Sequence, residues 1–110
     1  MAYDEDLAER VREVVASAAI FSEKKMFGGL AFLVRGHMAV AASGQGGLLL
    51  RCDPAETDAL AQQPDVGRFV MRGREMTGWL RVDPAAVESD ADLRRWVGFG
   101  LAYAGSLPPK

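Results

Sequence analysis

The chain opens with apolar side chains at helical spacing. In residues 4–19 these side chains recur every three or four positions: Leu7, Val11, Val14, Val15 and Ala18. Charged residues occupy the positions between them, and the acidic residues at the start suit the positive end of a helix dipole. The pattern predicts an amphipathic first helix over residues 4–19.

After Ser22 the spacing changes from helical to strand-like. Three short apolar runs follow, which cover residues 26–34, 37–43 and 48–52. The breaks between these runs carry turn residues, first Arg35-Gly36 and then the glycine-rich segment SGQGG. Short apolar runs separated by such turns predict three antiparallel strands joined by hairpins.

The second half of the chain alternates between helix and strand signals. Asp53 is placed to cap a short helix over 54–62, with Pro54 at its first position. Two more strands are predicted at 67–73 and 77–82. A last helix, over 90–104, follows a cap at Ser89.

The resulting order of elements is α-β-β-β-α-β-β-α. Connections of hairpin length favour antiparallel pairing, because parallel strands need long crossovers. We therefore predict an α+β fold with a mainly antiparallel five-stranded sheet and packed helices. At 110 residues, the chain has the length of a single domain, taken here as residues 1–110.

The predicted strands are apolar on both faces. In the second strand, simple alternation groups Met38, Val40 and Ala42 on one side, and Ala39 and Ala41 on the other. In an antiparallel sheet with one solvent-exposed face, each strand should instead alternate apolar and polar residues. Either helices cover both faces, or a partner, such as a second copy of the chain, closes one of them.

The last helix has a similar excess of apolar residues. Phe99 and Tyr103 widen its apolar surface, while Gly98 and Gly100 would allow another element to approach closely. This surface also favours self-association, and we expect a homodimer.

Composition and charge exclude several classes of protein. About half of the residues are apolar, and the formal net charge of −2 gives no general attraction to nucleic acid or to an anionic membrane. The single cysteine, Cys52, excludes an internal disulfide and a multi-cysteine zinc site. The longest apolar runs are too short to cross a membrane, and the acidic N-terminus does not resemble a signal peptide. We expect a cytoplasmic protein that contacts no membrane and needs no cofactor.

Two motifs raise the question of chemistry. Gly28-Gly29 follows two lysines, but a strand comes next, so no helix start is available to hold a phosphate group. A glycine pair in this position indicates a bend or a close approach of another backbone. Cys52 and His37 are the only candidate nucleophile and base, and an enzyme would need them within hydrogen-bond reach. We expect no enzymatic activity and no metal site.

Four arginines fall in or near the second pair of strands: Arg68, Arg72, Arg74 and Arg81. Arg68 and Arg72 are four positions apart, so they could share one face of a strand. A basic patch of this kind could contact nucleic acid or an acidic partner. The alternative is that these are ordinary solvated residues opposed by the many carboxylates of the chain.

Several long blocks resemble the N-terminal domain of the TfoX/Sxy competence-regulator family. The blocks are AYDEDLAERVREVV, KKMFGGLAFLVRGHM, RCDP, FVMRGREMTGWLRVDP and LRRWVGFGLAYAGSLPPK, in the order of the family. The resemblance implies an α-β₃-α-β₂-α domain similar to secretion-chaperone folds. It implies no enzymatic activity, since the named members resemble transcriptional co-activators of natural transformation that work with an activator of the cyclic-AMP receptor type. Those proteins continue into a C-terminal domain that this sequence does not include, so we expect a stand-alone module.

We therefore predict a regulatory, protein-binding module. Its candidate interaction surface combines charged, methionine and aromatic residues from two of these blocks: Lys25, Met26, Phe27, Arg72, Gly73, Arg74, Met76 and Trp79. The alternative is that Met26, Phe27, Met76 and Trp79 are core residues and only the charged residues are exposed.

Overall fold

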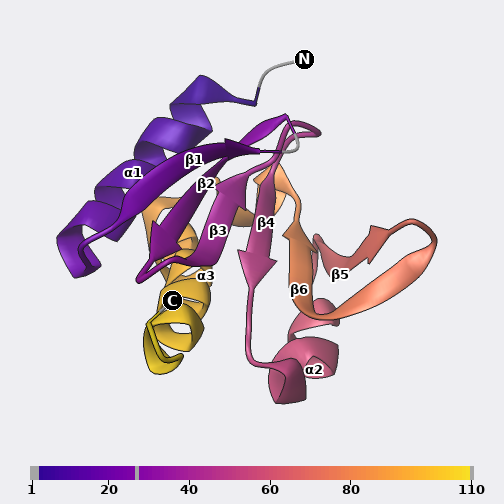
Figure 1. Cartoon of the computed structure of the whole chain (residues 1–110). Coiled ribbons are helices and arrows are strands. Elements are labelled where there is room, and N and C mark those ends of the chain that lie inside the picture. The colour runs from indigo at the N-terminus through magenta and orange to yellow at the C-terminus, as the bar shows by residue number, and fades with distance from the viewer. Residues whose placement is uncertain (1–2, 27, 110) are drawn as a thin grey trace.

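A computed structural model describes residues 3–26 and 28–109 of the chain (Figure 1). The α-helices are α1 (Glu5–Ala18), α2 (Thr57–Ala61) and α3 (Asp90–Ser106), and short 3₁₀ turns cover Pro54–Glu56 and Pro84–Val87. The strands are β1 (Ser22–Met26), β2 (Gly29–Val34), β3 (His37–Ala42), β4 (Leu48–Arg51), β5 (Val66–Met71) and β6 (Arg74–Val82). The fold is therefore α+β, as the sequence predicted.

The strands form one antiparallel sheet in the order β1-β2-β3-β4-β6-β5. The prediction of five strands was wrong by one, because the run 26–34 is not a single strand. Strand β1 ends at Met26, and β2 begins at Gly29. The pattern of apolar residues missed β1 because its sequence, SEKKM, is mostly polar and lies exposed at the edge of the sheet.

The glycine pair lies at the hairpin between β1 and β2. Gly28 has a φ of +76°, a conformation that glycine adopts without strain. At Gly29, a Cβ atom would lie 2.3 Å from the carbonyl oxygen of Ala42 on β3. The expectation of a bend with a close backbone approach is confirmed. A phosphate-binding loop would require a helix after the glycine pair, but strand β2 follows it.

A β-bulge changes the pairing between β2 and β3. Phe32 pairs with Val40, but Leu33 pairs with Met38, so Ala39 is the extra residue. Ala39 therefore packs in the buried cluster with Ala104 of α3, on the same side of the sheet as Val40. The simple alternation predicted for this strand was wrong, since Met38 and Ala41 share the opposite face.

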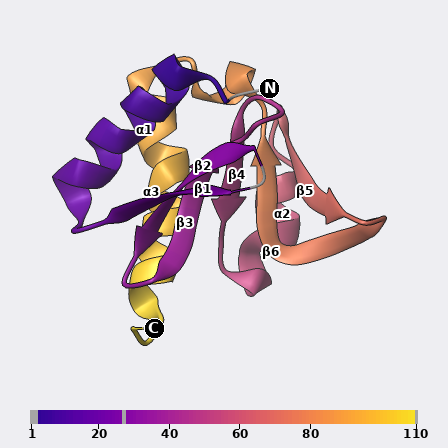
Figure 2. The ribbon, with the colours of Figure 1, turned by 45° about the horizontal axis from the view of Figure 1, so that its top comes forward.

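Helices α1 and α3 pack together on one face of the sheet, as Figures 1 and 2 show. The largest buried side chains between these two helices and the sheet are Trp96, Phe32, Leu48, Leu50, Leu80 and Leu93. The helices begin where the sequence indicated: Asp4 accepts hydrogen bonds from two amides of the first turn of α1, and Ser89 accepts one from Asp92 of α3. Arg12 of α1 also forms a two-point ion pair with Glu23 of β1, which lowers the pKa of the Glu23 carboxyl. The opposite side of the sheet, which α1 and α3 do not cover, is called the open face below.

The helix predicted over 54–62 is shorter than expected. A 3₁₀ turn occupies Pro54–Glu56, and only Thr57–Ala61 is α-helical. Asp53 caps the turn as predicted, by accepting a hydrogen bond from the amide of Ala55.

Among the helices that the structure describes, none combines the length and apolar character needed to cross a bilayer.

Strands β5 and β6 form a hairpin whose outer half projects from the rest of the sheet (Figures 1 and 2). Arg68 pairs with Leu80 and Val70 pairs with Glu75, so four residues of β6 lie opposite Phe69 alone. The chain bends at Gly78, which has a φ of +90°. The predicted strand 67–73 was too long, because Arg72-Gly73 forms the tight turn at the tip, with φ values of +54° and +78°.

Candidate functional site

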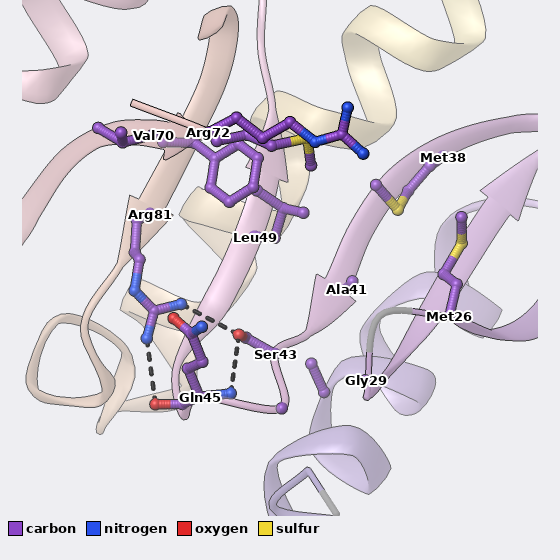
Figure 3. Close-up of a pocket in the computed structure, with 14 residues that line it drawn as sticks. Met26, Gly29, Met38, Ala41, Ser43, Gln45, Leu49, Val70, Arg72 and Arg81 are labelled. Carbon is purple, nitrogen blue, oxygen red and sulfur yellow. Dashed lines mark hydrogen bonds between the residues drawn. The ribbon is translucent and has the colours of Figure 1, made fainter. Parts of the chain in front are cut away.

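The open face of the sheet carries a groove of about 310 Å³. Its lining comes from the ends of β1 and β2, from β3, β4 and β6, from the loop between β3 and β4, and from the outer half of the β5–β6 hairpin (Figure 3). Apolar side chains and three methionines dominate this lining. Concave, mostly apolar surfaces with a few polar groups are typical of binding sites.

The floor of the groove is one row of paired residues across the sheet. Ala41 of β3 pairs with Leu49 of β4, which in turn pairs with Arg81 of β6, and all three residues line the groove. The alanine leaves the floor low at β3, since a methyl group extends little above the backbone. Met26 and Met38 stand on the β1–β3 side of this low region (Figure 3).

The opposite wall belongs to the β5–β6 hairpin. Phe69, Val70, Met71 and Arg72 all line the groove. The position of this wall depends on the bend at Gly78, because the bend carries the outer half of the hairpin out of the regular ladder.

Thr57 of α2 holds the bend in place. Its side chain is fully buried, and its Oγ1 atom accepts a hydrogen bond of 2.9 Å from the amide of Gly78. The same hydroxyl lies 3.3 Å from the carbonyl oxygen of Asp53, to which it donates. The carbonyl of Gly78 accepts a hydrogen bond from the amide of Cys52. The second helix thus positions one wall of a groove that it does not line.

Arg81 forms one end of the groove and holds the β3–β4 loop. Its Nη1 atom donates to Ser43 Oγ at 3.0 Å, and its Nη2 atom donates to the carbonyl oxygen of Gln45 at 3.1 Å (Figure 3). The Nη2 atom also donates to the carbonyl oxygen of Gly46 at 2.9 Å. All three acceptors are neutral. The guanidinium therefore organises the loop and keeps its positive charge at the groove.

A comparison with protein-family models matches residues 13–104 to the TfoX N-terminal domain. The match covers most of the 110 residues. This chain belongs to the TfoX N-terminal domain family. Comparisons with curated proteins and with solved structures gave no significant match. The resemblance noted from the sequence blocks is thereby confirmed.

The predicted surface residues of this TfoX N-terminal domain do not form one surface in the structure. Met26 and Arg72 line the groove, Gly73 forms the hairpin turn, and Phe27 lies outside the described residues. The remaining predicted residues do not line the groove: Lys25, Arg74, Met76 and Trp79. The alternative that the apolar members are core is wrong for Met76, which is 37% exposed.

Trp79 belongs to a different contact. The guanidinium carbon of Arg51 lies 5.1 Å from the centroid of the Trp79 ring and 5.4 Å from that of Tyr103 on α3. This cation–π arrangement joins the end of β4 to β6 and α3. It gives Trp79 a structural partner within the TfoX N-terminal domain.

The four arginines predicted as a basic patch have different environments. Arg68 forms ion pairs with Asp58 of α2 and with Glu75, and Arg81 holds the β3–β4 loop. Arg72 and Arg74, at the tip of the hairpin, form no ion pair and no side-chain hydrogen bond within the described part of the chain. The structure does not gather the four side chains into one surface.

The structure gives Cys52 and His37 separate partners. Cys52 is buried, its Sγ atom lies 3.6 Å from Thr57 Oγ1, and burial raises the pKa of its thiol. His37 Nε2 lies 2.7 Å from the carbonyl oxygen of Pro108. Within residues 3–26 and 28–109, these two side chains form no hydrogen bond to each other, and no group of three or more His, Cys, Asp or Glu is arranged to hold a metal ion.

Sequence reasoning missed the groove residues Met38, Ala41, Leu49 and Phe69 as members of a site. The signal that could have found three of them is the second apolar face of the strands, which the sequence does show. Assigning Met38 and Ala41 to one face required the bulge at Ala39, and placing Phe69 opposite them required the bend at Gly78. Neither irregularity is visible in the spacing of apolar residues.

Proposed function

We propose that this chain is a small, non-enzymatic regulatory module that binds a segment of a protein partner in the groove on the open face. The observation that carries the proposal is the arrangement of layers: α1 and α3 cover one face of the sheet, while the groove lies on the other face with an apolar, methionine-rich lining. Methionine side chains are flexible and polarisable, so such linings suit binding to protein segments.

Family membership supports a regulatory role for this binding. The resemblance to competence regulators leads us to expect a transcription activator as the partner. The buried, raised-pKa thiol of Cys52 also supports binding over nucleophilic chemistry, because the thiolate is the reactive form of cysteine.

A glutamate in place of Met38 is expected to weaken partner binding at least tenfold. Met38 is half-buried in the groove lining, and a carboxylate there would lose hydration whenever an apolar segment covers it. The tagged wild-type protein would be used to capture partners from the native cell, and each captured protein would be identified and tested again in purified form. A direct complex that M38E weakens at least tenfold supports the proposal.

The matched control is Ile20→Glu. Ile20 is 94% exposed, lies between α1 and β1, and does not line the groove, so the same apolar-to-acidic change should leave binding intact. Circular dichroism would establish that both variants are folded. Equal binding by M38E and the wild type would show that the groove is not the binding surface.

We also propose a homodimer, and we place its contact on the outer half of the β5–β6 hairpin. Met76 lies there with 37% of its surface exposed. Met76 lies outside the groove lining, so a dimer formed through it would leave the groove free. Light scattering is expected to give twice the mass of one chain for the wild type and for Ile20→Lys, and a single mass for Met76→Lys. A monomeric mass for the wild type at high concentration would contradict the dimer.

A further inference from the structure

The groove carries positive charge that nothing in its lining neutralises. Arg72 and Arg81 both line it, and the described lining contains no aspartate or glutamate, although the chain as a whole has a net charge of −2. The groove lining is therefore positively charged, whereas the net charge of the whole chain is negative. A concave apolar surface with this pattern favours an occupant that is both apolar and anionic.

The two arginines differ in how freely they can pair with a ligand. Arg81 already donates three hydrogen bonds to neutral acceptors. Asp65 and Asp83 lie beside it in a separate shallow depression, but neither forms an ion pair with it. Arg72 is exposed at the tip of the hairpin and can turn toward a carboxylate. Arg72 is thus the stronger candidate for direct pairing with a carboxylate of the ligand. Arg81 contributes positive electrostatic potential to the groove.

The lining also defines a place for one apolar side chain. Ala41 lies beside Leu49 in the floor, and its small side chain leaves a hollow there. Met26 and Met38 lie on one side of the groove, and Phe69 belongs to the hairpin wall on the other. An aliphatic side chain that enters the hollow would contact thioether and methyl groups, which adapt to its shape.

We infer that the groove selects an acidic, apolar segment of a partner protein. One aliphatic side chain of that segment fills the hollow above Ala41, and a neighbouring carboxylate pairs with Arg72. A guanidinium binds a carboxylate through two parallel hydrogen bonds, so this pairing sets the orientation of the segment as well as its affinity. The inference rests on the proposed function and specifies the chemistry of its partner.

The charge pattern disfavours two other occupants. A second copy placed groove to groove would bring Arg72 and Arg81 against their own equivalents, and like charges at an interface oppose association. Nucleic acid would be drawn to several phosphate contacts along a basic surface, whereas this groove offers two arginines within an apolar lining.

The test selects random eight-residue peptides on the wild-type protein and removes those that also bind the Ala41→Leu variant. The added leucine atoms would fill the hollow without changing charge. We expect the remaining peptides to be enriched in an aliphatic residue next to aspartate or glutamate. For one such peptide, Arg72→Gln should weaken binding about tenfold, since charge-assisted hydrogen bonds are lost.

Arg74→Gln is the matched control. It removes the same charge from the same hairpin tip, but Arg74 does not line the groove, so affinity should stay within about twofold of the wild type. Because both positions are exposed, this pair of variants remains informative even if Ala41→Leu does not fold. Equal weakening by the two variants would overturn the inference.

Other outcomes overturn the inference in distinguishable ways. Selected peptides that depend on the hollow but lack acidic residues would exclude the acidic segment and leave the proposed function standing. Dimerisation abolished by Ala41→Leu would make a second copy the occupant. Binding of a labelled DNA duplex or single strand at low salt, weakened by Arg72→Gln and not by Arg74→Gln, would make nucleic acid the ligand. A selection with no peptide sensitive to Ala41→Leu would also overturn it.

Discussion

Replacing Gly100 by alanine is expected to lower the free energy of unfolding by about 2–3 kcal/mol. A Cβ atom at this position of α3 would lie 2.3 Å from the carbonyl oxygen of Ala39 and 3.0 Å from Cδ1 of Leu50. The first contact is with backbone inside a buried layer, so the helix must move away from the sheet. Thermal unfolding followed by circular dichroism should show a midpoint about 10 °C lower than that of the wild type.

Gly98→Ala is the control for this prediction. Gly98 lies in the same helix two residues earlier, and a Cβ atom there would meet no atom within 4 Å. Alanine favours a helix over glycine by up to about 1 kcal/mol, so this variant should be as stable as the wild type or more stable. If Gly100→Ala unfolded at the same temperature as Gly98→Ala, the close packing of α3 on β3 would be refuted.

The second large effect is expected for Thr57→Val. Valine has nearly the same shape as threonine but cannot accept the hydrogen bond from the amide of Gly78, which would be left buried without a partner. We expect a loss of about 1–3 kcal/mol in the free energy of unfolding, measured by urea denaturation. The released bend should also loosen the hairpin wall, so the peptides selected on the groove should bind less tightly.

Thr77→Val tests whether this effect is specific to the buried hydroxyl. Thr77 lies next to Gly78 on β6, but its side chain is exposed. The same substitution there should change stability by less than about 0.5 kcal/mol. A similar loss in both variants would show that Thr57 does not hold the bend.

Local sequence signals predicted much of the fold because they act over a few neighbouring residues. The caps at Asp53 and Ser89 formed as predicted, since a cap depends on one side chain and the amides two or three positions ahead. The apolar spacing of α1 predicted its buried face, where Val11 and Val15 are fully covered. The apolar pattern missed strand β1 because this exposed edge strand has no apolar face.

The candidate site was predicted less well because its residues meet only through long-range pairing. Met26 and Arg72 were named from the sequence and do line the groove, but Arg74, Met76 and Trp79, from the same block as Arg72, do not. The tight turn at Arg72-Gly73 and the bend at Gly78 interrupt this block, so a block that carries a resemblance does not define a surface.

The sequence alone determined the class of this protein, which is an α+β domain of the TfoX N-terminal family. It also showed that the strands lack the apolar–polar alternation of a sheet with one solvent-exposed face. The tertiary structure decided which face is covered and where the open face is hollow. It did so through the bulge at Ala39, the bend that Thr57 holds at Gly78, and the close approach of α3 at Gly100. Each of these depends on contacts between segments far apart in the chain, and the periodicity of neighbouring residues carries no information about such contacts.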